Sequence, residues 1–372
     1  MTGKASEALK SHEGSVLKNL PTSQHLNLST FKHLDNVKLL ALLQQGIPLC
    51  RRPFEALADE VGCEEADVIG FLDDCRAQGL VRRFGAVFDT RRLGYRSALC
   101  AAAIPPSELD DIAARLTPLS GVTHCYLREP THPSPFPLHP SPSPSPFTLH
   151  PSPFTFPNLW FTLSYPADIF AAMADEVAAR LRPHEVHVLP ATRRYKVDVV
   201  FGAATRARDE SVEDDMSPIT PSDRAIIGAL QGDTEIRPDY FAALAAKLGM
   251  NEWDLLSTLE MWRRRGRLKR IGFLLAHRNA GWTANGMCCW RIDGDTTEAG
   301  RALAACDEVT HCYERPEAPT FPFNLFAMIH ARSPEEASTT FARLEESCRL
   351  SAGTMLISTR EYKKTSMTFF AK

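Results

Sequence analysis

The sequence predicts an α+β protein built from two copies of one unit, in which a three-helix part precedes a βαββαβ part. The first observation is an internal repeat, which organises the whole chain. VRRFGAVFDTRRLGYRSA at 81–98 corresponds to LKRIGFLLAHRNAGWTAN at 268–285, and VTHCYLR at 122–128 corresponds to VTHCYER at 309–315. Both correspondences have an offset of 187 residues. The second observation is that helical and strand-like hydrophobic patterns follow one another in the same order in both copies.

The first part of each copy is predicted to be helical. Residues 36–80 and 222–267 carry apolar side chains at helical spacing. Short breaks at glycines separate three helices in each copy, as in a helix-turn-helix. These glycines are Gly46 and Gly62 in the first copy and Gly232 and Gly249 in the second.

The second part of each copy is predicted to be rich in strands. In the first copy the candidate strands are 82–88, 96–104, 122–127, 159–164 and 186–199, and the helices are 107–117 and 168–182. A βαββαβ order predicts a ferredoxin-like domain, in which two helices cover one face of a four-stranded antiparallel sheet. We expect the two halves to pair their sheets with each other and so to form an internal pseudo-heterodimer.

A proline-rich insertion interrupts the first copy. Asn158-Leu-Trp-Phe161 corresponds to Asn324-Leu-Phe-Ala327 at an offset of only 166 residues, which places 21 additional residues before Asn158. The inserted segment repeats HPSP, and we expect an extended surface loop without chemistry of its own. The predicted organisation is a disordered segment 1–33, a helix-turn-helix domain 34–95, a ferredoxin-like domain 96–201 with the insertion at 129–157, an acidic linker 202–217, a helix-turn-helix domain 218–282 and a ferredoxin-like domain 283–372.

Composition excludes several classes of protein. Hydrophobic residues make up 44% and charged residues 23%, and the formal net charge is -3, as in ordinary globular proteins. The ten cysteines include no CxxC pair, which argues against a zinc ribbon or a cysteine-ligated iron–sulfur cluster. No apolar run approaches the ~20 residues of a membrane helix, and the first thirty residues lack the apolar core of a signal peptide. We expect a cytoplasmic, reduced protein that does not bind membranes.

The helix-turn-helix does not have the charge pattern of a DNA reader. A recognition helix brings cations and amides to bases and phosphates. The first copy has five acidic residues and a single arginine in Glu64–Ala77. In the second copy the basic cluster Arg263–Arg265 follows the part of the helix that contacts bases. The sequence therefore favours a packing or dimerisation module over DNA binding.

Repeated cations and imidazoles are the strongest candidates for chemistry. On a strand, His124, Tyr126 and Arg128 lie at i, i+2 and i+4 and share one face. The second copy repeats this trio as His311, Tyr313 and Arg315. The packing of an ordinary hydrophobic sheet face does not require such a set of polar side chains. Further cations occupy corresponding positions in the two copies, namely Arg83 and Arg270, Arg91 and Arg278, Arg193 and Arg360, and Lys196 and Lys363. For any single arginine, a solvated salt bridge is the alternative.

These motifs resemble those of the sirohaem decarboxylases, which share the Lrp/AsnC architecture. RRFGAVFDTRRLGY, HCYLR and NLWFTL look like the first-subunit type of the family, the AhbA and NirD proteins. AHRNAGWTANGMCCW, THCYERP, PFNLFAMIH and REYKKTSMTFF look like the second-subunit type, the AhbB and NirL proteins. The resemblance covers nearly all of the chain from about residue 34, and it implies a natural fusion of the two subunits, as in NirDL proteins.

The resemblance implies a carboxy-lyase that removes CO2 from the C12 and C18 acetates of sirohaem. The product, 12,18-didecarboxysirohaem, leads to haem d1 or, in other organisms, to haem. Arginines suit the eight carboxylates of sirohaem, and histidine is a plausible proton donor at neutral pH. We expect His311 to be the leading general acid with His124 as its counterpart, and either histidine is an alternative iron ligand. The other expected site residues are Tyr313 and Tyr126 as proton relays or positioning groups, and Arg315, Arg128, Arg270, Arg83, His277, Lys363 and Arg360 as substrate-binding groups.

Further expectations concern the substrate cleft, the cofactor, the partners and the alternative functions. An aromatic cleft of Phe84, Tyr95, Trp282 and Phe326 is expected to hold the macrocycle. No cofactor is expected beyond the iron of the sirohaem itself. The expected partners are sirohaem and either a second copy of the chain or paralogous sirohaem decarboxylase subunits. The alternative functions are a haem-responsive transcription regulator and a non-catalytic tetrapyrrole carrier.

Overall fold

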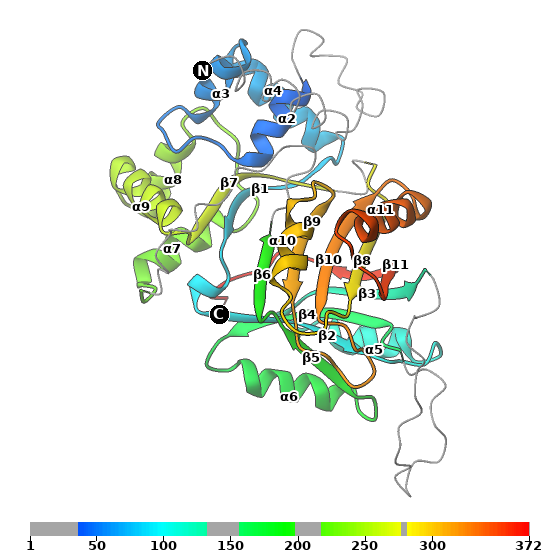
Figure 1. Cartoon of the computed structure of the whole chain (residues 1–372). Coiled ribbons are helices and arrows are strands. Elements are labelled where there is room, and N and C mark those ends of the chain that lie inside the picture. Colours follow the sequence, from blue (N-terminus) through cyan, green and yellow to red (C-terminus); the bar gives the residue numbers. More distant parts are fainter. Residues whose placement is uncertain (1–35, 132–155, 198–216, 277–280, 372) are drawn as a thin grey trace, which may run out of the picture. The chain divides into compact units, whose positions relative to one another are not determined.

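The chain forms two compact units, and both copies of the repeat contribute to each of them. The computed structural model describes residues 36–131, 156–197, 217–276 and 281–371 (Figure 1). The first unit comprises Met1–Gly94, Val200–Gly281 and Thr368–Lys372, and the second comprises Tyr95–Val199 and Trp282–Met367. Like parts of the two copies therefore assemble with each other.

The first unit contains the predicted three helices of each copy. Its helices are α2 (Asn36–Gln45), α3 (Pro53–Val61), α4 (Glu65–Ala77), α7 (Pro221–Leu230), α8 (Tyr240–Leu248) and α9 (Glu252–Arg264). Strand β1 (Val81–Phe88) of the first copy pairs with β7 (Leu268–Leu275) of the second in an antiparallel ladder. The paired glycines Gly85 and Gly272 lie opposite each other in this ladder. A Cβ atom on Gly85 would lie 2.3 Å from the carbonyl oxygen of Gly232, so only glycine fits beside the end of α7.

Aromatic side chains build the core of the first unit. The ring of Phe84 lies 5.4 Å from that of Tyr240 and 5.5 Å from that of Phe273, both edge to face. Phe84 has no exposed surface. The expectation that Phe84 lines a substrate cleft is therefore wrong, because its ring is already enclosed by side chains of both copies.

In its described residues, the second unit is a single sheet of nine strands with four helices. Its strands are β2 (Tyr95–Ala102), β3 (Val122–Pro130), β4 (Leu159–Pro166), β5 (Val186–Pro190), β6 (Arg193–Val197), β8 (Ala284–Trp290), β9 (Val309–Glu314), β10 (Leu325–Ala331) and β11 (Gly353–Lys364), and its helices are α5 (Leu109–Leu116), α6 (Phe170–Arg180), α10 (Thr297–Ala305) and α11 (Pro334–Ser347). The order of the strands is β5-β2-β4-β3-β11-β8-β10-β9-β6. The expected pairing of the two sheets is confirmed.

Each half lends the end of its last strand to the other half. Strand β11 pairs through Gly353–Ile357 with β8 of its own half and through its later residues with β3 of the first half. The first half uses two strands for the same purpose, because β5 pairs with its own β2 and β6 pairs with β9. The predicted single strand 186–199 is thus interrupted at Ala191 and Thr192, where the chain passes to the other half.

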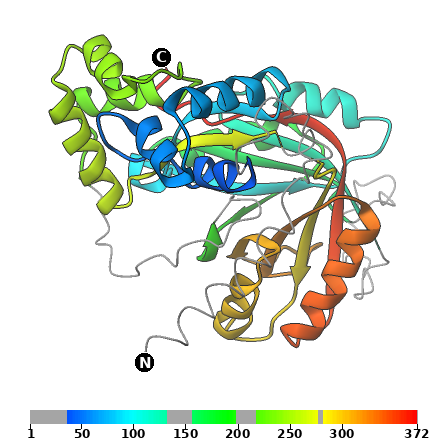
Figure 2. The ribbon, with the colours of Figure 1, turned by 90° about the horizontal axis from the view of Figure 1, so that it is seen from above.

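The sheet curls so that its two ends meet. Strands β5 and β6 end the strand order, yet only two residues separate them along the chain, so they lie close together. Helices α5 and α6 lie on one side of the unit and α10 and α11 on the other (Figures 1 and 2). The concave faces of the two halves therefore face each other inside the unit, and the helices cover the outer faces.

Three clusters of buried side chains fill this arrangement. One cluster packs the first-half strands against α5 and α6, and a second packs the second-half strands against α10 and α11. The third cluster, which we call the inner core, joins the halves, and it includes Trp160 of the first half and Phe321, Phe323 and Phe326 of the second. Among the described residues, no helix is both long enough and apolar enough to cross a membrane.

Candidate functional site

Both histidine–tyrosine–arginine trios lie on the inner faces of the sheet. Tyr126 is directly opposite Trp160 on β4, and Tyr313 is directly opposite Phe326 on β10. Directly opposed residues of an antiparallel pair share a face, and Trp160 and Phe326 both belong to the inner core. The tyrosine of each trio therefore faces the inner core, and Arg315 directly follows the last residue of β9.

The first-half trio runs from a half-buried histidine to a buried arginine, whereas all three residues of the second-half trio are half-buried. The rings of His124 and Tyr126 lie 6.2 Å apart, and those of His311 and Tyr313 lie 6.1 Å apart. The Cζ atom of Arg128 lies 5.3 Å from the Tyr126 ring centroid. The Cζ atom of Arg315 lies 4.8 Å from that of Tyr313. Each tyrosine ring therefore stands between an imidazole and a guanidinium, at distances suited to ring and cation–π contacts.

Hydrogen bonds fix the histidine rings at their Nδ1 atoms. The Nδ1 atom of His124 lies 3.0 Å from Oγ1 of Thr123, and that of His311 lies 3.1 Å from Oγ1 of Thr310. Both histidines are half-buried. The arrangement holds each imidazole at one end of its trio, where a proton donor would meet a ligand.

Each of the two arginines donates a hydrogen bond to a backbone carbonyl oxygen of the other half. Arg128 donates from Nη1 to the carbonyl oxygen of Leu356 at 3.4 Å, and Arg315 donates from Nη1 to that of Leu189 at 2.6 Å. Burial lowers the pKa of Arg128 to about 10 and also lowers the pKa of Arg315. Among the described residues, tyrosines and cysteines rather than carboxylates surround both guanidiniums. Enclosed cations of this kind can each take an anionic ligand.

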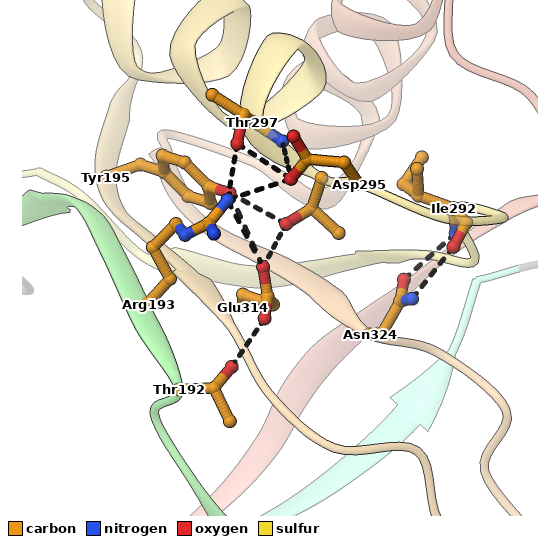
Figure 3. A network of polar contacts seen from close by, with 9 residues as sticks. Thr192, Arg193, Tyr195, Ile292, Asp295, Thr297, Glu314 and Asn324 are labelled. Atoms are coloured by element: carbon orange, nitrogen blue, oxygen red, sulfur yellow. Dashed lines mark hydrogen bonds and ion pairs between the residues drawn. The ribbon is translucent and has the colours of Figure 1, made fainter.

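An asparagine in each half positions the backbone of the arginine. In the second half, Nδ2 of Asn324 donates to the carbonyl oxygen of Ile292 at 2.8 Å, and its Oδ1 accepts from the Ile292 N–H at 2.9 Å (Figure 3). The carbonyl oxygen of Asn324 accepts from the N–H of Arg315 at 2.9 Å. Asn158 makes the same two side-chain bonds to Ile104. The repeated asparagine motif is therefore a clamp between the strand that carries the arginine and the loop after the first strand.

Arg360 and Lys363 were expected to bind the substrate, but both lie on the outer face. Arg360 donates to Asp110 at 2.6 Å, and its guanidinium lies over the Tyr362 ring. The ammonium of Lys363 donates to the carbonyl oxygens of Thr117 and Leu119, just after α5. A local irregularity in the pairing of β11 with β3 directs these side chains toward the helices. These contacts give both residues a structural role.

A polar network that sequence analysis missed occupies the corresponding outer surface of the second half. Arg193 donates to Asp295 at 2.9 Å, and Glu314 accepts from Thr192 at 2.8 Å and from the hydroxyl of Thr296 (Figure 3). These hydrogen bonds hold the pKa of the Glu314 carboxyl below its ordinary value. The repeat contained a sign of this network, because the position of Glu314 in the second copy is occupied by the apolar residue Leu127 in the first copy.

Two other predicted residues, Arg83 and Arg270, are not in the unit that holds the trios. Arg83 and Arg270 belong to the first unit, on β1 and β7. Arg83 donates to the carbonyl oxygens of Gly232 and Ala86, and burial lowers its pKa to about 10. His277 lies outside the described residues. The described residues hold no group of three or more His, Cys, Asp and Glu side chains suited to a metal ion.

The expected aromatic cleft is also wrong at Phe326. This side chain is 3% exposed and packs in the inner core beneath the guanidinium of Arg315. Tyr95 is buried as well, whereas Trp282 is half-buried and lies beside the guanidinium of Arg332. The sequence suggested a cleft because aromatic residues suit a macrocycle, but most of these rings are used for packing.

The basic residues of the helix-turn-helix parts are largely paired with acids. Arg76 at the end of α4 forms an ion pair with Asp233 at 2.7 Å. Arg263 and Arg264 at the end of α9 both contact Glu260, at 2.6 and 3.1 Å. This pairing reduces the positive charge that phosphates would require.

Comparisons with known proteins agree over most of the chain. The family model of the AsnC-like ligand-binding domain matches residues 92–196 and 279–363, and that of the siroheme decarboxylase NirDL-like HTH domain matches residues 36–82. A siroheme decarboxylase of Hydrogenobacter thermophilus is 33% identical over 342 residues, which cover 90% of this chain and 95% of that protein. The beta subunit of the siroheme decarboxylase of Methanosarcina barkeri is 34% identical over 39% of this chain and 97% of its own length.

Solved structures extend the likeness to the fold. A crystal structure of the siroheme decarboxylase NirDL has a TM-score of 0.66 and 31% identity, and it covers 90% of this chain and 94% of its own. A complex of NirDL with an iron-uroporphyrin III analogue has a TM-score of 0.65 and 30% identity over the same shares. Fold and motifs thus define a protein with two AsnC-like ligand-binding domains and helix-turn-helix parts in one chain. The chain belongs to the sirohaem decarboxylase family.

Proposed function

We propose that this protein removes CO2 from the C12 and C18 acetate side chains of sirohaem and so produces 12,18-didecarboxysirohaem. The observation that carries the proposal is the near full-length similarity to sirohaem decarboxylases, together with a trio of His, Tyr and Arg in each half. The product would serve the formation of haem d1 or, by an alternative route, of haem. Sirohaem is the substrate, and its iron is part of that substrate. No other cofactor is needed for the reaction.

The trio supplies the groups that decarboxylation of an acetate requires. Arg315, and Arg128 in the other half, would bind a substrate carboxylate, because a guanidinium matches the two oxygens of that group. Cleavage of the bond between the methylene carbon and the carboxylate releases CO2 and leaves an electron pair on that carbon. His311, with His124 as its counterpart, would donate the proton that converts the methylene carbon into a methyl group.

The tyrosines and the surrounding packing would control this proton transfer. Tyr313 stands between the imidazole of His311 and the guanidinium of Arg315, and it would keep the two groups apart. The buried side chains of the inner core lie beside the trio, and an apolar surrounding of this kind strengthens the attraction between a carboxylate and a guanidinium. The enclosed cation thus favours carboxylate binding, and the half-buried imidazole can regain a proton from solvent.

The two halves would act as the two subunits act in relatives with separate chains. One half of this chain covers almost the full length of a relative that is named a beta subunit. The strand exchange of β6 and β11 joins the halves as a pseudo-heterodimer within one chain. We propose that the fused chain works in the cytoplasm, alone, as a homodimer or with paralogous subunits.

Anaerobic incubation of the purified chain with sirohaem, followed by mass analysis of the tetrapyrrole, tests the proposal. We expect the loss of two CO2 molecules per sirohaem. The variant His311→Ala should still bind sirohaem but convert it much more slowly, because the proton donor is absent. Sirohaem that binds without any change in mass would refute catalysis by this chain alone and would favour a tetrapyrrole carrier.

A further inference from the structure

The strand that the opposite half places beside each trio differs between the two sites. Beside the second-half trio, Arg194 on β6 is directly opposite Tyr313. Beside the first-half trio, Glu361 on β11 is directly opposite Tyr126. The two positions correspond in the repeat, where RRYK at 193–196 aligns with REYK at 360–363. The duplicated sites therefore carry opposite charges at the same place.

Both charged residues belong to the inner face. Arg193 and Arg360, which precede them, contact acidic residues beside the helices on the outer face. Successive residues of a strand point to opposite faces, so Arg194 and Glu361 face inward with the tyrosines. Directly opposed residues have Cβ atoms about 4.5–5.5 Å apart, which brings the head group of a long side chain within reach of a ligand at the trio.

This difference changes the charge that each site offers to a carboxylate. The second-half site combines Arg194 with Arg315, and Val197 lies opposite its histidine. The first-half site combines Glu361 with Arg128, and Lys364 lies opposite its histidine. The second-half site therefore has two cations, Arg194 and Arg315, and neither Arg194 nor Val197 on the neighbouring strand is acidic. In the first-half site, the carboxylate of Glu361 would repel the acetate of a substrate.

Burial distinguishes the two sites independently of charge. Tyr126 is 7% exposed and Arg128 is 5% exposed, so both side chains of the first-half site are buried. Tyr313 and Arg315 are both half-buried. The Nε atom of Arg315 is enclosed and has no hydrogen-bond partner among the described residues. A buried donor without a partner is costly, so Arg315 retains unused hydrogen-bonding capacity.

We propose that Arg194 is a carboxylate-binding residue and that the second-half site, formed by His311, Tyr313, Arg315 and Arg194, takes the reacting acetate. The inference rests on the proposed function and assigns the reaction to one of the two duplicated sites.

Charge reversal at the two corresponding positions of the full chain tests this assignment. The variants are Arg194→Glu and, as the matched control, Glu361→Arg; both positions are exposed strand residues, so neither change disturbs the core. Sirohaem binding is followed by the change in tetrapyrrole absorbance, and conversion by mass analysis. We expect Arg194→Glu to weaken sirohaem binding about tenfold, because an attraction becomes a repulsion, and the loss should shrink at high salt. Glu361→Arg replaces a repulsion by an attraction and should therefore not weaken sirohaem binding.

Two additional measurements separate substrate binding from a structural role. Arg194→Lys retains the positive charge and should recover most of the affinity, and thermal unfolding should be unchanged in all three variants. Equal effects of Arg194→Glu and Glu361→Arg, or no effect of Arg194→Glu on binding, would overturn the assignment. Failure of the wild-type chain to convert sirohaem would instead refute the proposed function, and the binding titrations would still decide the role of Arg194.

Discussion

Replacement of Asn324 by alanine removes a clamp that positions the arginine of the second-half site. The side chain makes two hydrogen bonds to the backbone of Ile292, at 2.8 and 2.9 Å. Its own carbonyl oxygen accepts from the N–H of Arg315. The change therefore loosens the loop between β8 and α10 together with the start of β10, and it does so without changing a residue of the trio.

The expected loss of stability follows from those two bonds. A hydrogen bond contributes about 1 kcal/mol net, so Asn324→Ala should lower the free energy of unfolding by about 2 kcal/mol. For a unit of this size, that loss corresponds to a decrease in Tm of about 4–8 °C. Asn158→Ala removes the same two bonds in the other half and should cost the same amount. Urea unfolding and thermal unfolding of the full chain measure both effects.

Asn324→Asp makes the prediction sharper. The aspartate keeps the oxygen that accepts from the N–H of Ile292 but loses the Nδ2 donor, and its carboxylate faces the carbonyl oxygen of Ile292. We therefore expect a loss at least as large as the contribution of one hydrogen bond, about 1 kcal/mol. A loss below about 0.5 kcal/mol for Asn324→Ala, or an Asn324→Asp variant as stable as the wild type, would refute the clamp.

Three further predictions concern the outer surface of the second unit. Glu314→Gln should make the loss of stability below pH 4.5 less steep. The folded-state pKa of the Glu314 carboxyl is lowered, so this group stabilises the fold above pH 4.5 and loses that contribution as the pH falls. An unchanged acid-denaturation profile of the variant would contradict this prediction. Lys363→Met leaves two carbonyl oxygens without their donor and should lower the free energy of unfolding by about 2 kcal/mol, since one hydrogen bond contributes about 1 kcal/mol. An unchanged urea midpoint would contradict this. The sulfur atoms of Cys306 and Cys348 lie 3.8 Å apart, and burial raises the pKa of Cys306 to about 11. Because the thiolate is the reactive form, diamide should oxidise this pair to a disulfide faster as the pH rises toward 11. Peptide mass analysis measures the rate, and a rate independent of pH would contradict the prediction.

Local patterns in the sequence predicted the elements and their order. Helical spacing located the three helices of each copy, and alternation located the strands to within a few residues, because both periods depend only on neighbouring positions. The two trios were recognised for the same reason: residues at i, i+2 and i+4 of a strand share a face in any register. The repeat then showed the same trio in a second copy of common origin.

The sequence did not predict which face some cations occupy. Lys363 and Arg360 were expected near the substrate, but irregular pairing between β11 and β3 changes the alternation that sequence spacing assumes. The clamp at Asn324 was also missed, because its partner Ile292 is 32 residues away and takes part only through its backbone. Backbone partners leave no signature in the sequence. Aromatic residues such as Phe84 were assigned to a cleft because composition cannot distinguish core packing from ligand contact.

Differences between the copies are more informative about chemistry than their identities. Identical residues such as Asn158 and Asn324 reflect a shared fold, since the same clamp is needed in both halves. Leu127 and Glu314 differ on the outer face, where the change builds a polar network. Glu361 and Arg194 differ on the inner face, beside otherwise identical trios. Such a difference in charge at an inner position is the type of change that would restrict a polycarboxylate substrate to one of two sites with a common origin.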